Sequence, residues 1–242
     1  SLSVVKHVLD ALVEIPEIDV DHYGGGFERI IQLYPRTVYD FALKRIERYR
    51  DLGQNSRYQP LPRDILAQFE LPGLKKDPSY PQICTFLWDK MMSEASDDMR
   101  YVWRELFQGI VLDNVDFWLP KFTAAVKTAS TYEQLRQLTE VIHYDGSLII
   151  FRFPELTKAI LSRAKDLDEI EGYERMRTSL WIISGPSGRS YQNGELDGEK
   201  DYVEAEAIKT SATHAGDPVL GPFYRWIADT ERRERDDNRK RI

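Results

Sequence analysis

The chain has 242 residues, of which 42% are hydrophobic and 12% aromatic, so it has enough apolar surface for a sizeable core and is not disordered. Its formal net charge of −7 opposes a general attraction to nucleic acids or anionic lipids, because clustered cations hold both. Its single cysteine, Cys84, excludes an internal disulfide and a thiolate-based zinc site.

The sequence carries no targeting or membrane signal. No apolar run approaches the roughly 20 residues needed to cross a bilayer, and the first residues lack the basic-then-apolar layout of a signal peptide. Sparse cysteine is also typical of a reducing compartment. We therefore expect a cytoplasmic protein that does not enter a membrane.

Apolar residues recur at helical spacing through the first half of the chain. On the longest of these stretches we expect Arg45, Arg48 and Arg50 to point mainly to solvent. Glycine and proline mark the connections between the stretches. The expected helices cover 3–14, 27–34, 36–52, 64–69, 80–91 and 97–111.

The second half continues the helical pattern after a turn expected at 114–118, with Pro120 in a first helical turn. Thr131 with Gln134, and Asp168 with Glu171, have the spacing of N-terminal caps. The stretch 184–198 has four glycines and no apolar period, which predicts a surface loop. The expected helices cover 120–126, 131–142, 154–164, 168–181, 202–208 and a last one from Pro218 or Pro222 to 235, with a solvated, frayed tail.

About a dozen helices with mostly short connections predict an all-α protein, a HEAT-like α-solenoid of stacked antiparallel helical hairpins. We expect one helical-repeat domain over 1–242, with possible joints at 15–26 and 184–198. A loose internal repeat supports this. The stretch from Pro35 to Arg45 echoes the stretch from Pro154 to Arg163 with a one-residue slip.

Several motifs together resemble a known class of protein. They are Tyr58-Gln59-Pro60-Leu61-Pro62, Phe153-Pro154-Glu155-Leu156, Ser179-Leu180-Trp181 leading into Ser184-Gly185-Pro186-Ser187-Gly188-Arg189-Ser190, and Gly221-Pro222-Phe223-Tyr224-Arg225-Trp226-Ile227. Over roughly 36–235 the chain resembles the HEAT-like C-terminal region of large multidomain bacterial proteins, including STAND-type NTPases and related anti-phage defence proteins. The resemblance implies a C-terminal fragment of a larger protein, which acts as a sensor or scaffold beside a nucleotide-hydrolysing or effector domain.

The residues themselves favour interaction over catalysis, and we expect no enzyme activity, cofactor or metal. The loop 185–190 follows a helix and lacks the lysine of a P-loop, so we interpret it as a contact loop. Tryptophan and arginine dominate binding hot spots, which favours a surface near Trp118 and another near Trp226. The predicted surface for a protein partner, or for other domains of the parent chain, comprises Trp118, Gly185, Ser187, Arg189, Tyr191, Arg225 and Trp226.

Two alternatives stay open at this point. A helical enzyme would need distant ionisable groups to converge, and His143 beside Asp145 is the nearest candidate. A nucleic-acid-binding helical repeat would need a basic groove near the first long helix. The cations available there are Lys44, Arg45, Arg48, Arg50 and Arg57.

Overall fold

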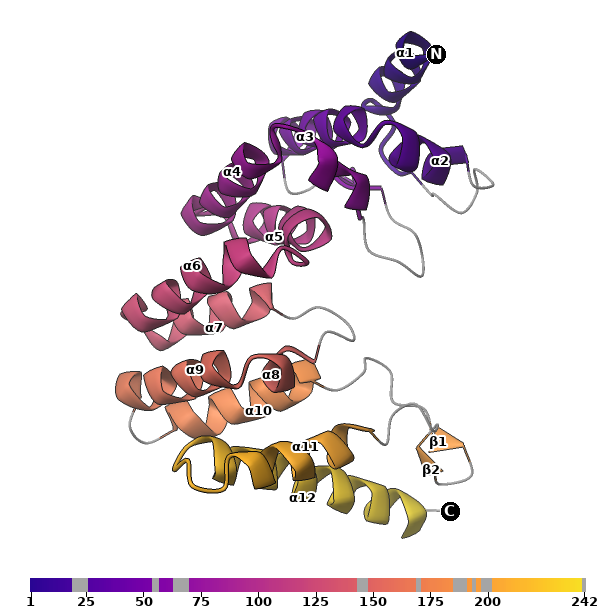
Figure 1. Ribbon diagram of the computed structural model, residues 1–242. Helices are drawn as coiled ribbons and strands as arrows, with labels where there is room; N and C mark the ends of the chain where they lie inside the picture. The colour runs from indigo at the N-terminus through magenta and orange to yellow at the C-terminus, as the bar shows by residue number, and fades with distance from the viewer. Residues whose placement is uncertain are drawn as a thin grey trace. The chain divides into compact units, whose positions relative to one another are not determined.

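The computed structural model describes residues 1–18, 26–53, 57–62, 70–142, 148–168, 171–184, 191–192, 195–196 and 202–240. Helices make up nearly all regular structure in these ranges (Figure 1), which confirms the all-α prediction. Two short strands, β1 (Tyr191–Gln192) and β2 (Glu195–Leu196), pair antiparallel inside the expected loop. The expected helix 64–69 lies outside the described residues. The stacking of hairpins into a solenoid stays a prediction.

The chain contacts divide into two compact units, Ser1–Trp118 and Leu119–Ile242. The expected joints at 15–26 and 184–198 fall inside these units. The single repeat domain over 1–242 stays a prediction.

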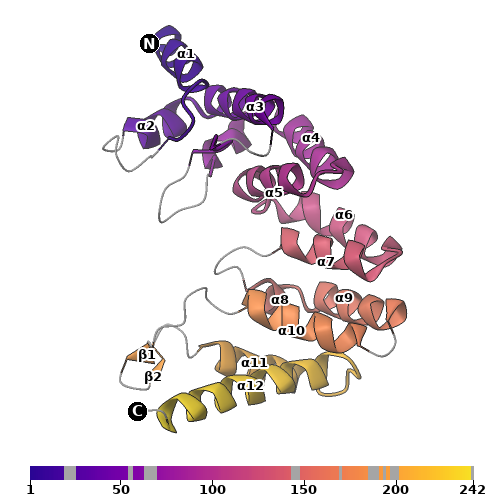
Figure 2. The same ribbon diagram turned by 180° about the vertical axis from the view of Figure 1, so that it is seen from behind.

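The first unit is built from helices that bury their apolar stripes against each other. Consecutive helices α4 and α5 lie side by side, joined by residues 94–96 only (Figure 1 and Figure 2). Val38, Ala42 and Ile46 are fully buried on one face of α3, as their spacing predicts. The elements are α1 (Leu2–Leu12), α2 (Gly26–Leu33), α3 (Pro35–Leu52), the 3₁₀ helix η2 (Pro72–Lys76), α4 (Tyr80–Ser93) and α5 (Asp97–Val111).

Arg45 corrects the expectation that the cations of α3 face solvent. Its side chain is fully buried and donates to the carbonyls of Leu12 at 2.7 Å and Ile15 at 2.8 Å, just where α1 ends. It also donates to the carbonyl of Gln59, and its guanidinium lies 4.4 Å from the ring centre of Tyr58. Helix C-termini leave carbonyls without partners, so this arginine ties α1 and the segment 57–62 to α3.

The start of the helix that follows α5 also differs from expectation. The expected turn at 114–118 is the first turn of α6 (Val115–Thr128), so Pro120 lies inside the helix. The helix starts early because the carbonyl of Asn114 accepts from the amides of Phe117 and Trp118. Pro120 is the sixth residue of the helix, beyond the first four amides that lack intrahelical partners, so α6 forms one backbone hydrogen bond fewer at this point.

The second unit repeats the pattern of packed consecutive helices. Figure 1 shows α9 beside α10 and α11 beside α12, and both pairs are in contact. The Arg163 side chain on α9 donates to the carbonyl of Ala129 after α6, as Arg45 does to the end of α1. The loose repeat therefore has a structural counterpart. The elements are α7 (Tyr132–Val141), α8 (Ile149–Arg152), α9 (Pro154–Leu167), α10 (Gly172–Ser184), α11 (Tyr202–Thr213) and α12 (Leu220–Lys240).

The predicted caps of the second unit are confirmed. The Thr131 hydroxyl accepts from the amide of Gln134 at 3.2 Å, and the Asp168 carboxylate accepts from the amide of Glu171 at 3.2 Å. The Gln134 side chain reaches the amide of Ser130, one residue before the expected cap. The last helix continues to Lys240, so the expected fraying of 231–241 is wrong within the described residues.

Candidate functional site

The start of α12 is fixed by an aspartate cap. The Asp217 carboxylate accepts from the amides of Val219 at 2.9 Å and Leu220 at 3.0 Å. Lys158 on α9 donates to the same carboxylate at 2.6 Å. The Lys158 hydrogen bond and the two amides lower the pKa of Asp217 to about 2. The charged cap therefore holds the first turn of α12 to α9.

The inner side of α12 is a continuous apolar contact. Phe223, Tyr224 and Ile227 are fully buried, and the Tyr224 hydroxyl donates to the carbonyl of Ile150. A Cβ on Gly221 would lie 2.8 Å from the carbonyl oxygen of His214, so the close approach of this turn requires glycine. These contacts set the rotation of α12 about its axis, and hence the side chains that face outward.

Trp226 is half-buried and held on several sides. Its ring centre lies 6.2 Å from that of Trp181 on α10 and 6.5 Å from that of Phe223. The Arg177 guanidinium lies 4.4 Å from its ring centre. Trp181 in turn donates through its indole Nε1 to the buried carboxylate of Glu231 at 2.7 Å. The indole is therefore fixed in place and still partly open to solvent.

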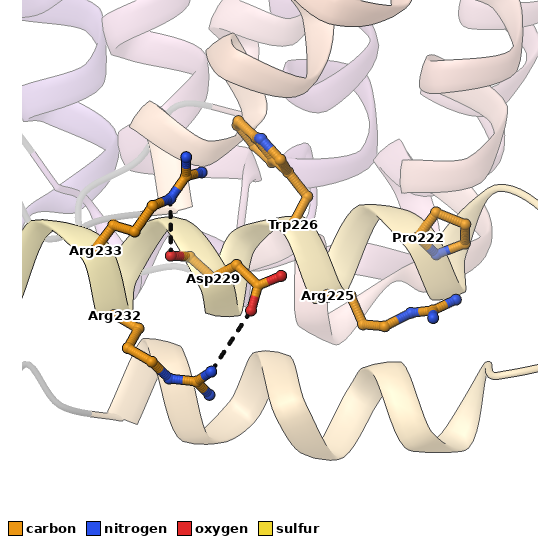
Figure 3. A pocket seen from close by; sticks show the side chains of 6 residues that line it. All are labelled: Pro222, Arg225, Trp226, Asp229, Arg232 and Arg233. Carbon is orange, nitrogen blue, oxygen red and sulfur yellow. Dashed lines mark hydrogen bonds and ion pairs between the residues drawn. The ribbon is translucent and has the colours of Figure 1, made fainter.

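The outward side of α12 forms an open depression of about 740 Å³, which we call the α12 face. Trp226 and Arg233 point to one side of the helix, and Arg225 and Arg232 point to the other, toward α11 (Figure 3). Asp229 lies between the two pairs. The α12 face consists of Pro222, Arg225, Trp226, Asp229, Arg232 and Arg233.

The arginines of the α12 face differ in their partners. Arg232 forms ion pairs with Glu204 on α11 at 3.2 Å and with Asp229 at 3.7 Å. Arg233 donates to the backbone carbonyl of Asp229 and to a hydroxyl, and Arg225 donates only weakly, to a carbonyl 3.4 Å away. Within the described part of the chain, Arg225 and Arg233 have no carboxylate partner. The face is therefore locally cationic on a chain whose net charge is −7.

A second hollow of about 360 Å³ adjoins the α12 face on the α11 side. Arg225, Asp229 and Arg232 line both hollows. The side chains that line only this second hollow are small or apolar, and Ile208 is 48% exposed. The remaining lining residues are Ser211, Ala212, Ala215 and Ala228. The two hollows thus form one surface, with a charged ridge and an apolar flank.

The structure places two of the predicted interaction residues together, Arg225 and Trp226. Trp118 is only 1% exposed and donates to the carbonyl of Leu112 at 2.6 Å, so it is a core residue, because α6 begins before it and turns it inward. Tyr191 forms part of β1, paired opposite Leu196. The other three predicted residues lie outside the described part of the chain: Gly185, Ser187 and Arg189.

Sequence reasoning missed Asp229, Arg232 and Arg233. The alternating charges of 231–241 instead predict a solvated tail. The available signal was spacing, since Pro222, Arg225, Asp229 and Arg232 follow the three-and-four alternation of one helix face.

Most of the cations considered for the alternative basic groove near α3 have carboxylate partners or are buried. Lys44 pairs with Asp10 at 2.7 Å, Arg48 pairs with Glu14 at 2.9 Å, and Arg50 pairs with Glu94 at 3.1 Å. Arg45 is buried, as described above. Most of the cations proposed for that groove are therefore already neutralised or enclosed.

The pair considered for catalysis lies in a part of the chain that the structure does not describe. His143 and Asp145 lie outside the described residues, and Cys84 is buried, which raises the pKa of its thiol. Among the residues that the structure covers, no three His, Cys, Asp or Glu side chains gather as they would around a metal. None of the helices searched in the same ranges has the length and apolar character of a membrane span.

Comparisons with known proteins give no match, whether with protein-family models, with curated proteins or with solved structures. The site is therefore interpreted from its own geometry and charge.

Proposed function

We propose that this chain is a non-catalytic protein-interaction scaffold and that the α12 face is its docking surface. The observation that carries the proposal is a fixed, half-exposed Trp226 beside two arginines, Arg225 and Arg233, without carboxylate partners in the described chain. Tryptophan and arginine are the residues most enriched at binding hot spots. A side chain already held in place also loses little conformational entropy when a partner binds.

The proposal includes the arrangement of the helical pairs as a HEAT-like α-solenoid. The packed pairs α4 with α5, α9 with α10 and α11 with α12 support it, because such repeats bury a continuous core only between neighbours. The sequence resemblance supports a further part, that the chain is the sensing or regulatory C-terminal region of a multidomain bacterial defence protein. In that setting the partner is a protein or another domain of the parent chain.

A peptide-display selection on the immobilised chain tests the docking surface. Peptides enriched on the unmodified chain are retested on a double variant, Arg225→Ala with Arg233→Ala, which removes two cations from the face. A matched variant, Lys165→Ala with Lys209→Ala, removes two exposed cations that line neither hollow.

We expect the first variant to lose most of the selected binders and the matched variant to retain them. Circular dichroism should show equal helicity for all three proteins, because none of the four side chains is buried. Binders that ignore the loss of Arg225 and Arg233, or a selection that enriches nothing, would contradict the proposed docking surface.

A further inference from the structure

The exposed cations of the α12 face are spaced by one heptad. Arg225 and Arg232 lie seven residues apart on the side toward α11. An α-helix rises 1.5 Å per residue, so their Cα atoms are about 10.5 Å apart along the axis. Trp226 and Arg233 repeat the same spacing on the other side, and Asp229 lies midway between the pairs.

The spacing of Arg225 and Arg232 indicates which backbone conformation a ligand with two carboxylates should have. Residues seven apart on a partner helix lie on one face and are separated by the same distance of about 10.5 Å. Residues on one face of an extended strand are separated by about 6.6 Å or 13 Å, which matches less well. The stripe from Pro222 through Asp229 to Arg232 has coiled-coil spacing, yet it is mostly charged, so an apolar helix does not fit it.

The charges select the chemistry of the ligand. Arginine presents a planar fork that binds a carboxylate through two hydrogen bonds, and Arg225 has no such partner among the residues described. Arg232 pairs with Glu204 at 3.2 Å and with Asp229 at 3.7 Å, but its side chain is 50% exposed and its guanidinium has five N–H donors, so it can bind a further carboxylate. Asp229 has a side chain that is 65% exposed in the middle of the face, so a third acid opposite it would be repelled. A hydrogen-bond donor at that point would instead be attracted.

From these observations we propose that the α12 face binds an acidic α-helix of a partner protein. The helix carries two carboxylates seven residues apart, which meet Arg225 and Arg232, and a hydrogen-bond donor between them, which meets Asp229. An apolar residue beside them packs on Ile208 in the adjoining hollow. This inference rests on the proposed function, since it names the partner of the same surface.

A nucleic acid fits the face less well than an acidic helix. Its backbone carries a charge at every step and cannot omit the one that faces Asp229. Glu204, which is paired with Arg232, adds a second carboxylate beside that arginine. A protein helix can place its acids only where the arginines are.

The first test compares two helical peptides of about 20 residues, long enough to form a helix. The first is built from alanine and glutamine, with glutamates seven apart, glutamine midway between them and leucine on the flank. The second has the same composition with the glutamates five apart. Fluorescence anisotropy of the labelled peptides measures their binding to the full chain.

We expect the heptad peptide to bind about threefold tighter, because an exposed arginine–carboxylate pair contributes about threefold and the second peptide can form only one of the two pairs. Equal affinities, or no binding by the heptad peptide, would overturn the inference. So would displacement of the peptide by a short DNA duplex at physiological salt, since this would show that the face prefers a phosphate backbone.

The second test exchanges charges. Arg225→Glu should weaken the heptad peptide about tenfold, because one attraction is lost and a repulsion replaces it. A peptide with lysine in place of the glutamate opposite that position should recover the affinity on this variant. Lys209→Glu makes the same change of charge on α11, outside both hollows, and should leave binding unchanged. Equal effects of the two variants, or no recovery by the lysine peptide, would overturn the pairing.

The two proposals fail in different ways. Selected peptides that depend on Arg225 and Arg233 but carry no heptad-spaced acids would refute the acidic helix and leave the docking surface standing. Selected peptides that depend on neither arginine would refute both.

Discussion

Arg45 gives the sharpest test of how the first unit is held together. The change is Arg45→Met, which keeps an unbranched side chain of similar length and removes every donor. In the folded protein this guanidinium is fully buried and donates to the carbonyls of Leu12, Ile15 and Gln59. No carboxylate accepts from it among the described residues, so backbone carbonyl dipoles and the ring of Tyr58 balance its charge.

The magnitude follows from two opposing contributions. Each buried carbonyl that loses its donor costs about 1–3 kcal/mol. The carbonyl of Leu12 keeps the amide of Ile15 as a donor, so the carbonyls of Ile15 and Gln59 together cost about 2–6 kcal/mol. Removing the charge relieves the cost of keeping a guanidinium away from water, which is several kcal/mol after relaxation. Burial also lowers the pKa of Arg45, which has the direction expected for that cost. We therefore expect the free energy of unfolding to fall by about 1–3 kcal/mol, within the usual range for a destabilising single substitution.

The matched control is Arg163→Met. Arg163 binds a single carbonyl, that of Ala129, and its side chain is 29% exposed, so water replaces the lost donor. This change should cost no more than about 1 kcal/mol. Urea unfolding followed by circular dichroism gives both values, and amide hydrogen exchange locates the effect. Faster exchange in α1 and 57–62 is expected for Arg45→Met only. A loss under about 1 kcal/mol, or equal effects of the two changes, would refute the reasoning.

Three further predictions concern single side chains. The pKa of Asp217, about 2 when folded, lies below its ordinary value of 3.8, so its stabilisation is full above about pH 4 and is lost as pH falls toward 2. Asp217→Asn should lack the loss of stability that this carboxylate causes as pH falls from about 4 toward 2, and an unchanged acid unfolding curve would argue against the cap. Trp118→Phe should cost about 1–3 kcal/mol in urea unfolding, because the carbonyl of Leu112 loses its donor, whereas an unaffected protein would place Trp118 at the surface. Cys84, which is fully buried, should react with a thiol reagent only after denaturant is added, and rapid reaction without it would contradict its burial.

The helices could be predicted because their signals are local. Apolar spacing marked α3, α5 and α9, and the caps at Thr131 and Asp168 depend on residues within three positions. Such signals act within one or two turns, so they survive without knowledge of the tertiary contacts.

The surroundings of charged and aromatic side chains could not be predicted in the same way. Arg45 is buried because the end of α1, about thirty residues earlier, offers it carbonyls, and no local pattern reports that. Trp118 is buried because α6 begins one turn before the expected position. The first error arose from a distant backbone group, and the second from a helix start that the sequence pattern placed too late.

The candidate site was predicted in part for the same reason. Arg225 and Trp226 follow from hot-spot composition, which depends on residue type alone. Arg232 and Arg233 belong to the face because α12 continues beyond its last apolar residues. Glu204 on α11 pairs with Arg232, and Glu231 accepts a hydrogen bond from Trp181 on α10, so both contacts stabilise this part of the helix. Those contacts come from other helices.

The central claim is that partners bind on the α12 face. Amide hydrogen exchange of the full chain, with and without a peptide taken from the display selection, tests it directly. We expect slower exchange in 208–215 and 220–233 on binding and no change in the first unit. Protection confined to the first unit, or none at all while the peptide is bound, would contradict the claim.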